Sequence, residues 1–422
     1  MQFYNSISRR KDAFEPVEPG KVSLYVCGLT PYDHTHIGHA RTYVAFDMLK
    51  RYLILKGYNV FHIQNITDVD DKIINRAKQN KEDPRALASR FHDEALELFG
   101  KLHILPADAY PKVTERIPDI IALVQKLISS NYAYETETGV YFEVNKFANY
   151  GKLSGQKQDE IIAGSRKEVD ESKRNPEDFA LWKKTKGEII EFESPWGTGR
   201  PGWHIECSAM AGSYAKTIDI HGGARDLIFP HHENEIAQSE AAGSNPFVKY
   251  WLHTGFLTVK GEKMSKSLGN FITLKDVLAE HHPNAVRMFF ALANYRSPID
   301  YNPAQIRQAQ STVEHLFGFI DSLDATLLAK KGNGKKNESL EIEISRKLAH
   351  ISAFLENDLD ISNAMAYVFS ITKSINTHVE GEKEHDYELL ALVKSEMEKL
   401  FYIIGLEKEE KKLLDEKTLE LV

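Results

Sequence analysis

The order of apolar and polar residues predicts a β-strand, a helix and a second strand near the N-terminus. Residues 22–27 (VSLYVC) form a short apolar run that ends at Gly28, as expected of a buried strand. From Gly38 the apolar residues recur at helical spacing as far as Gly57, and a second apolar run follows at 58–65. Parallel strands joined by a helix bind ligands at their carboxyl ends, so we expect a site there.

The remainder of the chain predicts an insertion into this sheet and a helical C-terminal part. A further helix follows residue 66, with Thr67 and Asp68 as candidate N-caps. We predict an α/β fold: a Rossmann-type parallel-sheet domain, split by an insertion and followed by an all-α helical bundle. The expected divisions are a first half of the sheet domain (1–108), a connective insertion with a helix at 117–131 and a strand at 140–144 (109–195), a second half (196–258), a loop and contact region (259–310), the bundle (311–406, with a loop at 329–339) and a charged tail (407–422).

Composition places the chain among ordinary globular proteins. It has 422 residues, of which 42% are hydrophobic and 27% charged, which excludes a fibre or a disordered chain and requires more than one domain. Two cysteines exclude a disulfide framework, and neither a signal peptide nor a membrane span is evident, so we expect a cytoplasmic protein. A net charge of −8 disfavours a non-specific binder of polyanions.

The loop between the first strand and its helix carries two histidines beside a glycine. His36, Gly38 and His39 belong to the sequence HIGH at a helix N-terminus, where main-chain N–H groups favour phosphate. Gly38 allows a ligand to approach the backbone, and the two imidazoles can stabilise charge that develops on phosphoryl oxygens. Taken alone, these residues equally suit a polar helix cap.

A second loop, at 263–267, has the sequence KMSKS. Lys263 and Lys266 bracket small residues, with Gly261 and Gly269 on either side, and such a loop suits a mobile arm that closes on a triphosphate. A lone loop of this kind is more often a surface turn. Together, in this order and on these elements, the two sequences resemble the paired motifs of class I aminoacyl-tRNA synthetases. The resemblance implies that both motifs bind ATP and stabilise the formation of an aminoacyl-adenylate.

Cysteine, histidine and carboxylate side chains form a candidate metal site. Cys27 ends the first strand, Cys207 lies in GWHIECSAM, and FPHHENEI places His231 and Glu235 four residues apart on one helix face. Two thiolates, an imidazole and a carboxylate form a plausible tetrahedral set for zinc. His232, three residues from Glu235, is an alternative histidine, and two buried cysteines beside an unrelated polar helix would give the same pattern.

Several segments narrow the resemblance to the cysteinyl-tRNA synthetase family: LYVCGLTPYDHTHIGHARTYVAFD, QNITDVDDKI, YGKLSGQ, RNPEDFALWK, GWHIECSAM, IDIHGGARDLIFPHHENEIAQSE and KMSKSLGNF. This resemblance implies one zinc ion per subunit, held by Cys27, Cys207, His231 and Glu235, and the use of ATP with Mg²⁺. It also implies that Lys266 contacts ATP and that the pocket for cysteine is lined by Thr67, Trp203 and Asp226, with His221 nearby.

The family implies L-cysteine, ATP and tRNA(Cys) as partners, and a monomer that does not bind membranes. Zinc would separate cysteine from serine because a thiolate is the softer ligand, so we expect no editing domain. Residues 407–422 are too short for the mixed domain that reads the anticodon in this family. Two alternatives therefore stay open: a cysteine–amino-sugar ligase of mycothiol synthesis, and a catalytically inactive RNA-binding relative. Glu235 and the intact HIGH and KMSKS residues favour the synthetase.

Overall fold

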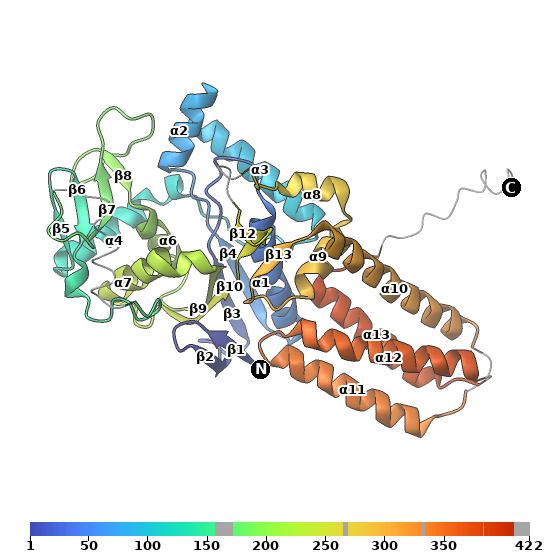
Figure 1. Cartoon of the computed structure of the whole chain (residues 1–422). Helices are drawn as coiled ribbons and strands as arrows, with labels where there is room; N and C mark the ends of the chain where they lie inside the picture. Colours follow the sequence, from blue (N-terminus) through green and yellow to red (C-terminus); the bar gives the residue numbers. More distant parts are fainter. Residues whose placement is uncertain (157–171, 265–268, 331–333, 383, 409–422) are drawn as a thin grey trace.

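A four-stranded parallel sheet with the strand order β10-β9-β3-β4 forms the centre of the molecule (Figure 1). The computed structural model describes residues 1–156, 172–264, 269–330, 334–382 and 384–408. The predicted α/β fold with a parallel sheet is confirmed. The strands are β3 (Lys21–Val26), β4 (Asn59–Gln64), β9 (Ile218–Ala224) and β10 (Val248–Thr254).

Side chains of β3 alternate between the two faces of the sheet. Leu24 and Val26 pack in the main core, which includes the apolar side of α1 (Ile37–Leu55). Tyr25 and Cys27 belong to a second core, formed with residues of the helices on the opposite face. Because successive side chains of a strand point to opposite faces, the sequence of β3 directs Cys27 toward those helices.

Helix α2 (Asp71–Asn80) begins later than the sequence predicts. Its N-cap is Asp70, whose side chain accepts a main-chain N–H of the first turn, so the prediction that Thr67 or Asp68 caps it is wrong. Asp68 accepts the main-chain N–H and the hydroxyl of Thr114 instead, at 3.1 and 2.6 Å. The backbone stays extended as far as Asp70, which leaves Thr67 at the carboxyl end of the sheet beside β4.

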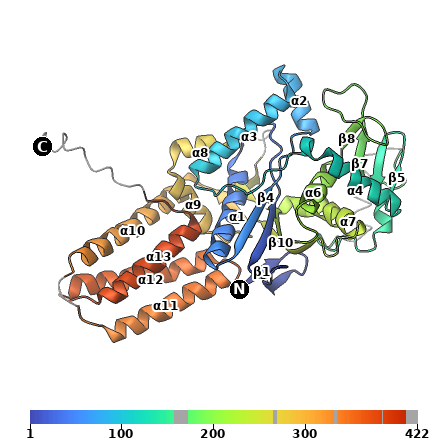
Figure 2. The same ribbon diagram turned by 180° about the vertical axis from the view of Figure 1, so that it is seen from behind.

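A second, antiparallel sheet with the order β5-β6-β7-β8 lies beside the parallel one (Figure 2). It comes from the part of the chain that we predict as an insertion, 109–195, although β8 lies beyond that limit. Phe142 and Trp182 are buried in its core. This layer comprises α4 (Ile117–Ser129), β5 (Ala133–Glu135), β6 (Gly139–Phe142), β7 (Phe179–Lys184), β8 (Gly199–Pro201), α6 (Trp203–Gly212) and α7 (Glu233–Ala241).

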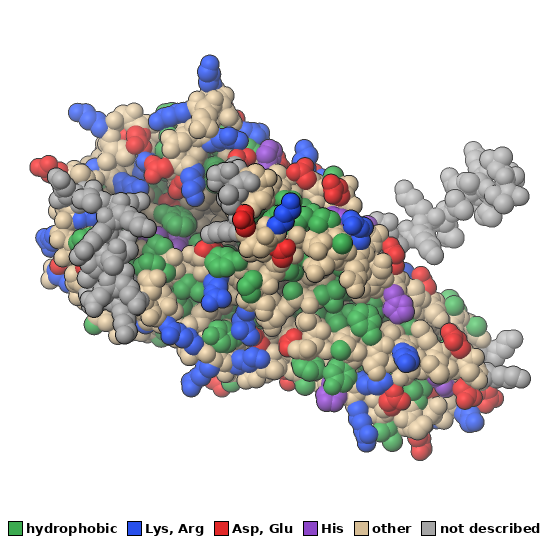
Figure 3. Space-filling model, in the orientation of Figure 1, with side chains coloured by type: hydrophobic (Ala, Val, Ile, Leu, Met, Phe, Trp, Pro, Cys, Tyr) green, Lys and Arg blue, Asp and Glu red, His purple; other side chains and the backbone are tan. Residues whose placement is uncertain are grey.

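Among the described residues, four long helices form the C-terminal bundle, where the sequence predicts a helical bundle over 311–406 (Figure 1). None of the described helices is long and apolar enough to cross a membrane. On the face shown in Figure 3, basic and acidic side chains are interspersed over the bundle. The bundle consists of α10 (Pro303–Leu328), α11 (Glu338–Glu356), α12 (Ile361–Gly381) and α13 (Tyr387–Ile404); the other elements are β1 (Gln2–Asn5), β2 (Arg10–Ala13), α3 (Pro84–Lys101), β11 (Leu257–Val259), β12 (Glu262–Lys263), α8 (Leu274–Glu280), α9 (Pro283–Ala291) and β13 (Ile299–Tyr301).

A buried ionic cluster joins the bundle to the sheet domain. Asp47 of α1 accepts hydrogen bonds from Arg51, at 2.8 Å, and from Arg287 of α9, at 2.5 Å. Arg287 also donates to the carbonyl oxygens of Leu102 and Ile404, at 2.8 and 2.5 Å. Because Ile404 ends α13, one guanidinium group fixes the end of the bundle relative to the helix that follows the HIGH sequence.

Candidate active site

A cavity of about 650 Å³ opens at the carboxyl ends of β3, β9 and β10. This is where ligands bind in open parallel sheets, and it matches the position expected from the sequence. Residues far apart along the chain meet in its wall. They include Cys27, His36, Gly38, His39, Lys72, Asp226, Gly255 and Met264.

The HIGH loop presents two imidazoles at the start of α1. His36 is the N-cap, and its Nδ1 accepts the main-chain N–H of His39 at 3.2 Å. The two rings stack with centroids 3.5 Å apart, and Thr35 Oγ1 lies 3.1 Å from His39 Nδ1. Burial and the neighbouring His36 lower the pKa of His39 well below its usual value. His39 is therefore a neutral imidazole near pH 7, in the first turn of a helix.

The backbone at Gly28 passes unusually close to the loop after β4. A Cβ atom added to Gly28 would lie 1.5 Å from the carbonyl oxygen of Asn65, and the Gly28 N–H donates to Asn65 Oδ1 at 2.8 Å. Only glycine allows this approach. The contact fixes the position of Cys27, which immediately precedes it.

Four buried side chains meet behind this cavity as a candidate metal centre. Ligand atoms of Cys27, Cys207, His231 and Glu235 all lie within 4.8 Å of one another. His231 Nε2 is 3.0 Å from Glu235 Oε1, as expected for residues four apart on one helical face. Cys27 follows β3, Cys207 lies on α6, and the other two lie at or just before α7. The structure thus brings together every residue of the zinc set that the sequence predicts.

A second set shares two members of this cluster. Cys27, His221, His232 and Glu235 also offer ligand atoms within 4.8 Å of one another. Cys27 Sγ lies 3.2 Å from His232 Nε2, and His221 Nε2 lies 2.9 Å from Glu235 Oε2. The alternative histidine considered from the sequence therefore lies at the centre as well.

The charges in the cluster suit a bound cation. A hydrogen bond from Cys27 lowers the pKa of Cys207 to about 6, although burial opposes this shift. Burial raises the pKa of Glu235, but His221 and His231 outweigh it and lower the value to about 2. Burial lowers the pKa of His231, but Glu235 and Cys207 outweigh it and raise the value to about 10, so a protonated imidazole balances the buried carboxylate and thiolate. A soft divalent metal bound by sulfur, nitrogen and oxygen would take the place of that proton.

Comparison with known proteins identifies the family. The family model for the catalytic domain of class I (C) tRNA synthetases matches residues 13–311. A cysteine–tRNA ligase of Thermococcus onnurineus is 48% identical over 392 residues, which cover 91% of this chain and 82% of the relative. The chain belongs to the cysteine–tRNA ligase family. A second member, from Pyrococcus abyssi, is 45% identical over 432 residues, which cover 100% of this chain and 90% of the length of that relative.

Solved structures support the same fold. Methionyl-tRNA synthetase of Mycobacterium tuberculosis, in complex with methionyl-adenylate, superposes with a TM-score of 0.69 over 91% of this chain and 89% of its own, at 16% identity. The leucyl-tRNA synthetase of Agrobacterium radiobacter K84, in a ternary complex, gives a TM-score of 0.67 over 94% and 86%, at 12% identity. These structures show the fold, and the family model over residues 13–311 confirms the predicted membership of the class I synthetases.

The residues that family resemblance assigns to the cysteine pocket differ in their surroundings. Asp226 lines the cavity, and Thr67 is buried beside it, where its hydroxyl accepts a hydrogen bond from Asn65 at 3.3 Å. Trp203 is 40% exposed, so it is no core residue, and its ring centroid lies 4.3 Å from that of His231. His221 is fully buried and contacts Glu235 rather than the cavity.

The KMSKS sequence falls partly outside the described residues. Lys266 lies outside them, and Lys263 belongs to the short strand β12, which pairs with β11. Met264, between them in sequence, lines the cavity, and its sulfur accepts the main-chain N–H of Ile272 at 3.3 Å. The start of this motif therefore reaches the cavity wall next to the HIGH loop, where a Cβ atom built on Gly38 would lie 3.6 Å from Met264 Cε.

Several residues of the site were not predicted from the sequence. His204 Nδ1 lies 3.0 Å from His231 Nδ1, and His253 Nε2 lies 2.8 Å from His232 Nδ1. Both support imidazoles of the metal centre. His204 could have been predicted because it lies three residues before Cys207 on the same helix. His253 could have been predicted because it is a polar residue at the carboxyl end of a parallel strand. Lys72, a cation in the cavity wall, carried no such signal.

Proposed function

We propose that the protein charges tRNA(Cys) with L-cysteine at the expense of ATP. The carboxylate of cysteine attacks the α-phosphorus of Mg²⁺-bound ATP and displaces pyrophosphate, which gives cysteinyl-adenylate. The terminal ribose hydroxyl of the tRNA then attacks the adenylate carbonyl and releases AMP. The observation that carries this proposal is one cavity bordered by Cys27 of the metal centre, by the HIGH histidines and by Met264 of KMSKS.

The metal centre serves to recognise the substrate side chain. We assign zinc to Cys27, Cys207, His231 and Glu235, because only this set contains both cysteines and zinc favours thiolate ligands. The chemistry that zinc supplies when bound is recognition of a soft thiolate in preference to a hydroxyl. The chain's own residues prepare this site: they exclude water from the cluster and hold two of the ligands as anions.

Positioning of cysteine falls to residues around the metal centre. Asp226, a carboxylate in the cavity wall, is suited to bind the substrate ammonium group. The Thr67 hydroxyl and the exposed edge of Trp203 are suited to orient the carboxylate toward ATP. Fixing both reactants in this way supplies much of the rate enhancement in reactions of this type.

ATP is bound between the two signature motifs. When the Thr35 hydroxyl donates to His39 Nδ1, the proton of this neutral imidazole resides on Nε2, and this N–H group can donate a hydrogen bond to a phosphoryl oxygen. His36 and Gly38 form the other part of this cradle, at the N-terminus of α1. We assign to Lys263 and Lys266 the role that the family resemblance implies, which is to neutralise the charge that develops as pyrophosphate leaves.

Aminoacylation of purified transcripts tests the proposal. We expect charging of tRNA(Cys) with labelled cysteine, and no charging with serine in its place. The family relatives named above are tRNA ligases, which favours tRNA over an amino sugar as the acceptor. Cysteine-dependent exchange between ATP and pyrophosphate without transfer to any tRNA would refute the second step, and absence of exchange would refute the first.

A further inference from the structure

A buried arginine lies in the second turn of α1, just after the HIGH loop. Arg41 is 4% exposed, and its guanidinium group donates hydrogen bonds to three main-chain carbonyl oxygens: those of Phe256 at 2.9 Å, Tyr295 at 3.4 Å and Ser297. Burial lowers the pKa of Arg41 to about 10, so the group is charged at neutral pH, and no carboxylate among the described residues forms an ion pair with it. Because a buried cation is costly to desolvate, this arrangement depends on the three carbonyl oxygens.

The three carbonyl oxygens belong to two segments that meet beside the active-site cavity. Residues 255–257, at the start of β11, line the cavity together with the HIGH histidines, and Tyr295 and Ser297 lie in the loop between α9 and β13. The N–H of Gly255 donates to the Tyr295 carbonyl at 2.9 Å, and a Cβ atom built on Gly255 would lie 2.4 Å from the Ser297 carbonyl oxygen. Two main-chain segments therefore approach each other closely here, and Arg41 holds both of them to α1.

The position of this junction determines where the KMSKS sequence begins. Strand β11 pairs with β13 in parallel, with Leu257 beside Ile299, and with β12 in antiparallel register, with Thr258 beside Lys263. Met264 follows directly and lines the cavity. A shift of β11 would therefore move the first residues of KMSKS relative to the HIGH loop.

We propose that Arg41 is a positioning residue for ATP. It fixes residues 255–257 and, through β11 and β12, the start of KMSKS relative to the HIGH loop on its own helix. Arg41 is not among the residues that line the cavity, so it acts through these main-chain segments and does not touch the nucleotide. A displacement of about 1 Å in groups that bind a reactant can cost about 10²-fold in rate. This role rests on the proposed use of ATP in this cavity.

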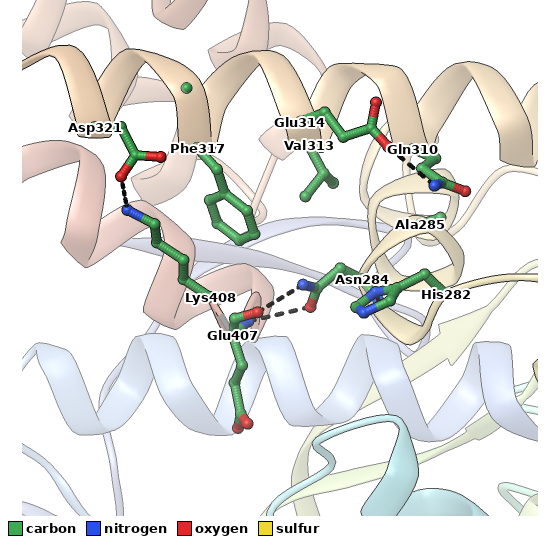
Figure 4. Close-up of a pocket in the computed structure, with 11 residues that line it drawn as sticks. His282, Asn284, Ala285, Gln310, Val313, Glu314, Phe317, Asp321, Glu407 and Lys408 are labelled. Atoms are coloured by element: carbon green, nitrogen blue, oxygen red, sulfur yellow. Dashed lines mark hydrogen bonds and ion pairs between the residues drawn. The ribbon is translucent and has the colours of Figure 1, made fainter. Parts of the chain in front are cut away.

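The groove shown in Figure 4 is a poorer site for a triphosphate, although it is larger. It has a volume of about 810 Å³ and lies between α9, α10 and residues 407–408. Val313 and Phe317 point into it, and its other lining residues include Glu314, Asp321 and Glu407. These carboxylates would repel the phosphates, and of the two cavities only the one at the sheet includes main chain that Arg41 holds. Binding of ATP therefore reports on the cavity at the sheet.

Binding of the non-hydrolysable β,γ-methylene analogue of ATP, with Mg²⁺, tests the role of Arg41 in the full-length protein. Arg41→Met removes all three hydrogen bonds, and we expect the Kd of the analogue to rise by on the order of tenfold. Arg41→Lys keeps the charge but lacks the fork that reaches several carbonyl oxygens, so it should recover only part of the affinity. Zinc content, and the KM for cysteine at saturating ATP, should stay within about twofold of the values for the unchanged protein, because other elements build the metal centre.

Arg51→Lys is the matched control. Arg51 is a buried arginine of the same helix and also donates to main-chain carbonyl oxygens, those of Tyr402 and His103, but these lie away from the cavity wall. We expect Arg51→Lys to lower the Tm, as Arg41→Lys does, and to leave the Kd of the analogue unchanged. The comparison of the two lysine variants stands even where Arg41→Met does not fold.

Three results would overturn this role of Arg41. They are an unchanged Kd of the analogue in both Arg41 variants, an equal rise in Arg51→Lys, and a loss of zinc or of cysteine affinity that accompanies the loss of ATP affinity. The last two would reduce Arg41 to a general contribution to stability. Failure of the proposed function is seen separately, because it would appear as an absence of tRNA charging by the unchanged protein.

Discussion

Removal of the buried carboxylate that joins the bundle to the sheet domain should destabilise the protein strongly. Asp47 is 1% exposed and is hydrogen-bonded to Arg287, which is fully buried, and to Arg51, which is 6% exposed. Asp47→Asn keeps the shape of the side chain but removes its charge and sets an N–H group beside two guanidinium groups. The arginines would then stay buried without their counter-charge.

The expected size of this effect follows from burial. Removing one partner of a buried ion pair costs about 3–5 kcal/mol of unfolding free energy. With an unfolding entropy of about 2.1 cal/mol/K per residue, this corresponds for 422 residues to a fall in Tm of about 4 °C. Glu356→Gln is the matched control, because it breaks the exposed ion pair between Lys56, the C-cap of α1, and Glu356 of α11, whose side chains are 35% and 44% exposed. This change should cost only about 0–1 kcal/mol.

Scanning calorimetry and urea unfolding of the two variants measure the difference. Both changes remove one charge from a link between α1 and the rest of the chain, so only burial distinguishes them. Equal losses of stability, or a loss below about 1 kcal/mol for Asp47→Asn, would refute the reasoning that the desolvated guanidinium groups depend on this carboxylate.

Three further changes test the site and the core. Cys207→Ser should release the metal and lower cysteine-dependent ATP–pyrophosphate exchange by at least about 10²-fold; metal analysis and the exchange assay check this, and Ser208→Ala on the same helix is the control. Gly28→Ala should abolish cysteine activation, because its Cβ atom would lie 1.5 Å from the carbonyl oxygen of Asn65; a normal KM for cysteine would contradict this. Burial lowers the pKa of His62 to about 3, and neither ring nitrogen has a hydrogen-bond partner among the described residues. The folded state therefore disfavours the protonated ring, so the part of the stability that depends on His62 is complete above pH ~6.5 and falls by about 2 kcal/mol at pH ~5. His62→Phe should remove this loss in urea unfolding measured at the two pH values, and an unchanged pH dependence would count against it.

Local signals in the sequence were sufficient for the fold class and for the two signature motifs. The strand at 22–27 and the helix that follows were placed within one residue of β3 and α1, because period-2 and helical patterns are set by which side chains a strand or helix buries. Cys27 was predicted to end this strand, and it directly follows β3. The cap of α2 was wrong, since several polar residues in ITDVDD can cap and the choice of Asp70 depends on contacts of Asp68 with distant Thr114.

The metal centre shows where sequence reasoning reached its limit. Its residue types were predictable, because zinc chemistry restricts the ligands to a few side chains. That His221 and His232 form a second set with Cys27 and Glu235, also within 4.8 Å, and that His204 and His253 support the imidazoles, depended on how α6, α7 and β10 pack.

The sequence by itself determined the parallel sheet, the HIGH and KMSKS motifs and the residue types of the metal centre, because each arises from local periodicity or from a short stretch of chain. Tertiary structure alone decided which side chains meet across long separations: Arg287 with Asp47, Asn65 against Gly28, and the groove between α9 and α10. Such contacts are selected by the packing of whole elements, and sequence spacing does not encode the distance between residues that are remote along the chain.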